Sequence, residues 1–256
     1  MATFAFFDAL RESLKPRRFL IWLLLCVGCF GLGLQWEAII GGTADERYGQ
    51  LSSMIVFRML ALAAAILSTN IISQEIEQKT VVYLLTRPIP RWQLLLARLG
   101  ASVIVTFIIG LLGALGLALG VYHTLPLGEA LFLRDIPALG FASLAYCSLF
   151  LLISLMFNRA MLVCLIYAFG VEMIAPSLQG DLYKISLFSY AQGIAQHPVM
   201  KGAGEKGLTL ISGQLADHPM ETATAIISLV VVSLACSALS VWWFGHFEYV
   251  PREDAE

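Results

Sequence analysis

Long apolar runs separated by short polar segments dominate the pattern of this chain. Six runs approach or exceed the roughly 20 helical residues that cross a hydrocarbon core of about 30 Å. They are residues 19–36, 51–72, 94–121, 136–157, 161–178 and 224–244. Because backbone groups must be satisfied inside lipid, the runs predict helices. We expect an all-α integral membrane protein with six transmembrane helices, forming a single domain over residues 1–256.

The composition agrees with this pattern. The chain is 59% hydrophobic and 13% charged, whereas soluble domains are about half apolar and about a quarter charged. It has too little polar surface to cover a water-soluble globule. The net charge of -2 gives no basic field that would attract nucleic acid, so we expect no nucleic-acid partner.

The residues before the first apolar run predict a short helix lying on the membrane surface. Phe4, Phe7 and Leu10 fall on one side of such a helix, and Asp8 and Glu12 fall on the other. The basic N-terminus followed by an apolar run also resembles a signal peptide. However, no small-residue cleavage site follows, which favours an uncleaved first span.

The distribution of Lys and Arg predicts the orientation. With the N-terminus inside, ten basic residues are internal: Arg11, Lys15, Arg17, Arg18, Lys79, Arg87, Arg91, Arg98, Arg159 and Arg252. Five are external: Arg47, Arg134, Lys184, Lys201 and Lys206. Cytoplasmic segments carry the excess of positive charge. We therefore expect both termini and the segment 73–93 in the cytoplasm, and a long outer loop at 179–223 whose part 183–195 is apolar enough to enter the outer leaflet.

The polar segment 73–93 has the features of a short helix. Ser73 can cap a helix N-terminus, and Glu75 and Glu77 in the first turn suit the helix dipole. Pro88 prevents the helix from continuing, and Arg91 then lies at the membrane interface. On spacing alone, an ordinary loop between the second and third spans explains these residues equally well.

Residues 75–98, EIEQKTVVYLLTRPIPRWQLLLAR, resemble the signature of type 2 ABC exporter permeases, the membrane subunits of ATP-driven export systems. That signature has an acidic residue, Gly-Thr or Arg-Thr, two leucines, a proline, an arginine and a basic residue entering the third span. The matching positions are Glu75, Glu77, Thr80, Leu84, Leu85, Pro88, Arg91 and Arg98. Lys79 departs from the pattern. The six spans, the surface helix and the long last outer loop also fit the family.

The resemblance implies a function. The segment 73–93 would be a coupling helix that binds a separate cytoplasmic ABC ATPase subunit. ATP and Mg would lie on that subunit, and the permease would bind no cofactor directly. A second permease copy would form a homodimer with this chain, or a related permease would pair with it, in the lipid of the bacterial inner membrane. The chain has no G-x-x-x-x-G-K-[ST] motif to hold nucleotide itself. Changing Glu75 or Thr80 is predicted to uncouple ATP hydrolysis from export without preventing membrane insertion.

Two charges fall within predicted spans, Arg58 and Glu172. Intramembrane charges usually pair or face the interior of a helix bundle. One hypothesis is that Arg58 contacts Glu172 and the two line the translocation path or a dimer interface. Equally, Arg58 can extend toward the outer surface while Glu172 is protonated or hydrated from that side.

The sequence gives less support for catalysis, metal binding or disulfide formation. The sequence has no H-E-x-x-H or G-x-S-x-G motif, so a stand-alone intramembrane enzyme or immunity-type protein is the alternative function. His123, His197 and His218 are interpreted as ordinary loop histidines, and no metal site is predicted. The five cysteines lie in apolar runs and predict no disulfide framework. Small residues at Gly110, Gly113, Gly116 and 61–65 predict close helix packing.

Overall fold

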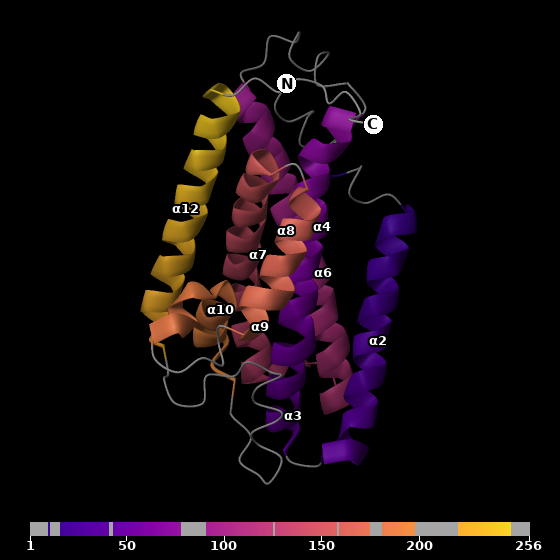
Figure 1. Ribbon diagram of the computed structural model, residues 1–256. Coiled ribbons are helices and arrows are strands. Elements are labelled where there is room, and N and C mark those ends of the chain that lie inside the picture. Colours follow the sequence, from indigo (N-terminus) through magenta and orange to yellow (C-terminus); the bar gives the residue numbers. More distant parts are fainter. Residues whose placement is uncertain are drawn as a thin grey trace.

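The computed structural model describes residues 10, 16–40, 43–77, 91–124, 126–157, 159–174, 181–197 and 220–246. The regular elements within these residues are helices, arranged as a bundle whose long members run roughly parallel and antiparallel (Figure 1). The long helices are α2 (Pro16–Ile40), α4 (Phe57–Glu77), α6 (Arg91–Tyr122), α7 (Ala130–Met156) and α12 (Thr222–His246). Shorter α-helices are α3 (Ala44–Leu51), α8 (Ala160–Ile166), α9 (Glu172–Ile174) and α10 (Leu187–Ala195).

Four described helices are long and apolar enough to cross a membrane: Ala44–Asn70, Trp92–Tyr122, Ala130–Met156 and Thr222–His246. They correspond to the second, third, fourth and sixth predicted spans. The first and fifth predicted spans fall on shorter apolar helices, Leu20–Gln35 and Ala160–Ile174. The structure therefore supports an all-helical membrane protein with four candidate spans, and the count of six stays a prediction.

The helix that contains the second span begins earlier than the apolar pattern indicates. Thr43 caps α3: its hydroxyl accepts a hydrogen bond from the backbone N–H of Glu46, and the Glu46 carboxylate accepts one from the backbone N–H of Thr43. This reciprocal pair satisfies two backbone donors that a helix start otherwise leaves free. A π-helical segment, η1 (Ser52–Val56), then joins α3 to α4. Such segments are common at functional sites.

At its other end, α4 continues through Ser73 to Glu77. The prediction that Ser73 caps a new helix is therefore wrong. No glycine or proline interrupts the sequence before Ser73 in α4, and extending an existing helix avoids the cost of nucleating another. The helix that contains the third span, α6, begins at Arg91, three residues before the predicted span 94–121. The surface helix near residues 4–14 lies outside the described residues, apart from Leu10.

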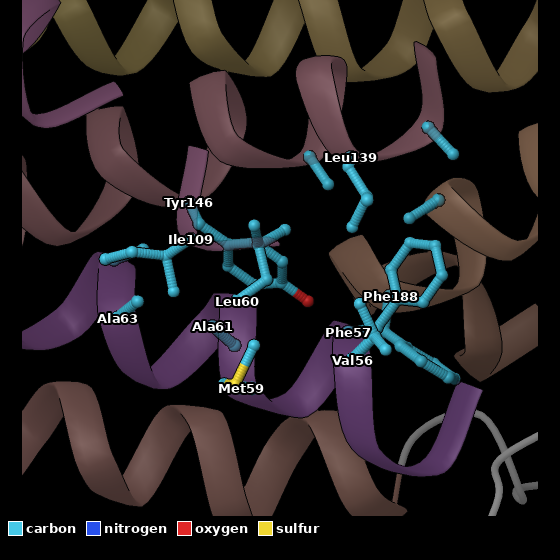
Figure 2. Packing of buried hydrophobic residues seen from close by; sticks show 14 of the residues in the cluster. Val56, Phe57, Met59, Leu60, Ala61, Ala63, Ile109, Leu139, Tyr146 and Phe188 are labelled. Atoms are coloured by element: carbon cyan, nitrogen blue, oxygen red, sulfur yellow. The ribbon is translucent and has the colours of Figure 1, made fainter. Parts of the chain in front are cut away.

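Helix α7 contacts α4, α6, α8, α10 and α12 and lies within the bundle (Figure 1). Figure 2 shows Phe57 and Leu60 of α4 packed close to Leu139 and Tyr146 of α7, Ile109 of α6 and Phe188 of α10. These side chains are almost completely covered.

Close packing at small residues is confirmed. A Cβ added at Gly110 would meet Leu60, and one at Gly113 would meet Met59. Ala61, Ala63, Ala64 and Ala65 are buried.

The tightest approach joins α2 to α6. A Cβ at Gly116 would lie 2.8 Å from the Cys26 carbonyl oxygen, and one at Gly120 would lie 2.5 Å from the Phe30 carbonyl oxygen. A glycine pair four residues apart lets two helix backbones approach this closely. Gly33 of α2 contributes as well, since a Cβ there would lie 3.0 Å from the Leu117 carbonyl oxygen.

The predicted outer loop contains structure. Residues Asp181–Ile185 form a 3-10 helix and α10 follows. Eight of the nine α10 residues are buried, because α10 packs against α7 and α12. The apolar character of 183–195 therefore reflects packing against the bundle. Helices α3 and α10 lie at the same end of the bundle (Figure 1), which we call the α3/α10 end.

Candidate functional site

The structure describes part of the predicted ATPase-binding segment. Glu75 and Glu77 lie in the last turns of α4, and Arg91 is the first residue of α6. The end of α4 and the start of α6 lie at the same end of the bundle, opposite the α3/α10 end (Figure 1). Thr80, Leu84, Leu85 and Pro88 lie outside the described residues. The structure thus gives the helical backbone at both ends of the segment.

Arg58 lies near the middle of the helix Ala44–Asn70. Its Cζ is 4.4 Å from the centre of the Phe188 ring, which is within cation–π distance. Phe188 in turn meets Phe57 edge-on, with ring centres 6.0 Å apart. The Nε, Nη1 and Nη2 atoms of Arg58 are covered by the protein and have no hydrogen-bond partner among the described residues.

Glu172 is buried, with 1% of its surface exposed. Its carboxylate accepts hydrogen bonds from the Ser186 hydroxyl at 2.6 Å and from the backbone N–H groups of Leu187 and Phe188 at 3.1 and 3.0 Å. These N–H groups belong to the first turn of α10, where a helix attracts negative charge. Ser186 also accepts a hydrogen bond from the Ser189 N–H. Glu172 therefore fixes the N-terminus of α10 to α9.

Arg58 and Glu172 both contact Phe188 and therefore lie in the same region of the bundle. Glu172 binds the Phe188 backbone, and Arg58 contacts the Phe188 ring. Arg58 and Glu172 attract each other electrostatically but form no hydrogen bond, because the guanidinium nitrogens have no hydrogen-bond partner among the described residues. The alternative that Arg58 extends to the surface does not fit this geometry, because those nitrogens are covered. A role of the pair in lining a translocation path or an interface stays a prediction.

A second buried polar cluster surrounds Asp135 of α7, whose side chain is fully buried. Its Oδ2 atom accepts hydrogen bonds from the Tyr48 and Ser52 hydroxyls, both at 2.7 Å. Its Oδ1 atom lies 2.7 Å from Nε2 of His197, whose side chain is also fully covered. Tyr48 comes from α3, Ser52 from the π-helical segment and His197 from the residues after α10. We call Tyr48, Ser52, Asp135 and His197 the Asp135 cluster.

Ser53 extends this cluster. Its hydroxyl lies 3.2 Å from Nδ1 of His197 and also bonds to the Gly49 carbonyl oxygen at 2.5 Å. The order Ser53, His197, Asp135 is that of a hydrolase triad, but all three side chains are buried and Ser53 already bonds to its own helix. The arrangement is suited to holding α10 in place. Gln196 adds a 2.8 Å hydrogen bond to Thr222 of α12.

Sequence reasoning missed most of this cluster. His197 was interpreted as an ordinary loop histidine: it does lie after α10 outside any helix, but its side chain is covered and contacts Asp135. Asp135 was placed just outside the fourth span, but α7 begins at Ala130 and includes it. Large sequence separations join these residues, 87 positions for Tyr48 and 62 for His197. One local signal was available, the T-x-x-E capping box at Thr43.

The described residues show little capacity to bind metal. No group of three or more His, Cys, Asp or Glu in this part of the chain is placed to hold a metal ion. The five cysteines are free thiols, and all are buried.

A model for the family described as ABC-2 family transporter protein matches residues 10–248. A comparison with curated proteins finds no similar sequence. The matched range begins before α2 and ends after α12, so it includes the whole helical bundle and the segment 73–93.

Proposed function

The chain belongs to the ABC-2 transporter family, and from this premise we propose that it couples ATP hydrolysis on a separate ATPase subunit to the export of a substrate. Membership of the family makes it the multi-pass membrane permease of an ABC transporter, a subunit that generally acts with an ATPase subunit. The proposal concerns the coupling of ATP hydrolysis to transport, the direction of transport and the assembly of the permease with its ATPase subunits.

One observation carries the coupling proposal: α4 continues past its apolar run. The run ends at Ile72, and the helix continues through the polar residues up to Glu77. At 1.5 Å per residue, these five residues extend the helix by about 8 Å. A force applied near Glu75 and Glu77 would therefore act on the same helix that contains Phe57 and Arg58. The residues that match the family signature continue from this helix end.

The polar end of α4 would face the cytoplasm. The excess of Lys and Arg in the segments at this end supports that orientation, with both termini inside and the α3/α10 end outside. We assign α2 and Ala160–Ile174 as the first and fifth of six spans. The complete transporter would be two copies of this chain with two ATPase subunits, in the inner membrane of a bacterium.

Affinity purification from the native membrane tests the proposal. The tagged chain is expected to recover an ABC ATPase subunit and a Mg-dependent ATPase activity that vanadate inhibits. Recovery of the intact chain with no ATPase subunit, under several mild detergents, would favour the alternative of a stand-alone intramembrane enzyme or immunity-type protein. An irrelevant membrane protein carrying the same tag is the control for non-specific recovery.

A further inference from the structure

Arg58 is a charge in an apolar span that no hydrogen bond neutralises. A guanidinium has five N–H donors, and the three nitrogens of Arg58 that carry them are covered and without partners among the described residues. Covering the N–H groups of a charged side chain without giving them hydrogen bonds is unfavourable. Such a group needs a partner in some state of the protein.

Glu172 does not supply the missing hydrogen bonds. Both oxygens of Glu172 are engaged by the first turn of α10, through Ser186 and the N–H groups of Leu187 and Phe188. Arg58 is attracted by the Glu172 carboxylate and contacts the face of the Phe188 ring, and neither interaction is a hydrogen bond. An aromatic ring partly compensates the charge of a guanidinium. It accepts no hydrogen bond from the N–H groups, which point outward in the plane of the guanidinium. The donors of Arg58 therefore remain available for an oxyanion.

Helix α10 places the Phe188 ring over the guanidinium of Arg58. Phe188 is its second residue, and buried hydrogen bonds hold α10 at both ends. At the N-terminal end the anchor is Glu172, and at the C-terminal end it is the contact between His197 and Asp135. A shift of α10 away from α4 would move Phe188 off Arg58. Because the guanidinium nitrogens are covered by this chain itself, a ligand reaches them only after such a shift.

We propose that Arg58 forms a binding site for an anionic group of the transported molecule, a phosphate or carboxylate, and that α10 closes this site by placing Phe188 over the guanidinium. The planar guanidinium binds such oxyanions in a bidentate manner. This assignment of a substrate class rests on the proposed transport function. The anion would come from a phospholipid headgroup or from a soluble molecule.

Binding to the purified chain in non-ionic detergent tests the site. One arm measures inorganic phosphate by equilibrium dialysis, and the other measures short-chain phosphatidylglycerol by native mass spectrometry. Saturable binding of one probe per chain is expected in at least one arm. Binding of phosphate identifies a soluble anion as the source, and binding of phosphatidylglycerol alone identifies a lipid headgroup.

Three variants locate the site. Arg58→Gln is expected to weaken binding at least about tenfold, because it removes the charge-assisted hydrogen bonds to the oxyanion. Arg134→Gln removes the same charge from an exposed position of α7 and leaves binding unchanged. Phe188→Leu keeps an apolar cover but removes the ring that competes for Arg58, so binding becomes tighter.

Arg58→Gln also separates a binding role from a structural one. Loss of covered N–H groups that have no hydrogen bonds is expected to leave the melting midpoint at or above that of the wild type. A clear fall in the midpoint, unchanged binding in Arg58→Gln, or no saturable binding in either arm would overturn the proposal. Those results would leave the transporter assignment intact, because recovery of an ATPase subunit does not involve Arg58. Conversely, binding at Arg58 without an ATPase subunit would overturn the transport function alone.

Discussion

Replacing Asp135 with alanine removes the acceptor that joins three separate parts of the structure. Tyr48 and Ser52 donate to Oδ2, and His197 contacts Oδ1, each at 2.7 Å. The carboxylate thus links α3, the π-helical segment and His197, two residues after α10, to α7. No other described side chain makes all of these contacts.

The expected cost follows from the groups left without an acceptor. Ser52 can turn its hydroxyl toward a carbonyl oxygen of its own helix, so two groups remain unsatisfied, the Tyr48 hydroxyl and the His197 ring. Each unsatisfied buried group costs about 1–3 kcal/mol, which predicts a total loss of about 2–6 kcal/mol for Asp135→Ala. Asp135→Asn keeps the shape and one acceptor oxygen, so its loss is expected to be smaller.

Two measurements check this prediction in detergent. The melting midpoint should fall most in Asp135→Ala, less in Asp135→Asn and not at all in Glu221→Ala, which removes an exposed acid just before α12. Hydrogen–deuterium exchange should become faster in Leu187–Ala195 while the amides of α2 keep their wild-type rates. Wild-type stability together with wild-type exchange in α10 would refute the role assigned to the Asp135 cluster.

Two further substitutions test the packing and the start of the second span. Gly120→Ala places a methyl group against the Phe30 carbonyl oxygen and is expected to destabilise by about 1–3 kcal/mol. In contrast, Gly28→Ala meets no atom within 4 Å and should be neutral or slightly stabilising, so equal melting midpoints for the two variants would contradict the close α2–α6 contact. Thr43→Ala removes the hydroxyl of the capping box and is expected to cost about 1 kcal/mol, whereas Thr43→Ser should melt like the wild type. An unchanged midpoint in Thr43→Ala would show that this cap contributes nothing.

Much of the bundle could be predicted because apolar length is a local property of the sequence. The predicted sixth span at 224–244 is close to α12 at Thr222–His246, and the third at 94–121 is close to α6 at Arg91–Tyr122. The small residues of α6 also predicted its close packing. In these helices, the apolar run and the observed helix begin and end at nearly the same residues.

The incorrect predictions of helix boundaries and contacts occur where a polar residue lies inside the fold. Asp135 was excluded from α7 because a charge beside an apolar run usually marks its end, but distant hydroxyl groups and His197 satisfy it. Ser73 has the chemistry of a cap, yet an unbroken helix already reaches it. The position of α10 depends on Glu172 and Asp135, which no local pattern connects to it. The role of Glu75, Glu77 and the residues that follow them stays a prediction from resemblance.

In the proposed transporter, ATP hydrolysis on the ATPase subunit drives the conformational change of this permease through the segment at the end of α4. The most direct measurement compares ATP hydrolysis and export in membrane vesicles that contain the complete transporter. Glu75→Ala and Thr80→Ala are expected to insert normally and to hydrolyse ATP with little or no export, whereas the control Glu221→Ala keeps both activities. Wild-type export per ATP hydrolysed in both Glu75→Ala and Thr80→Ala would contradict the claim.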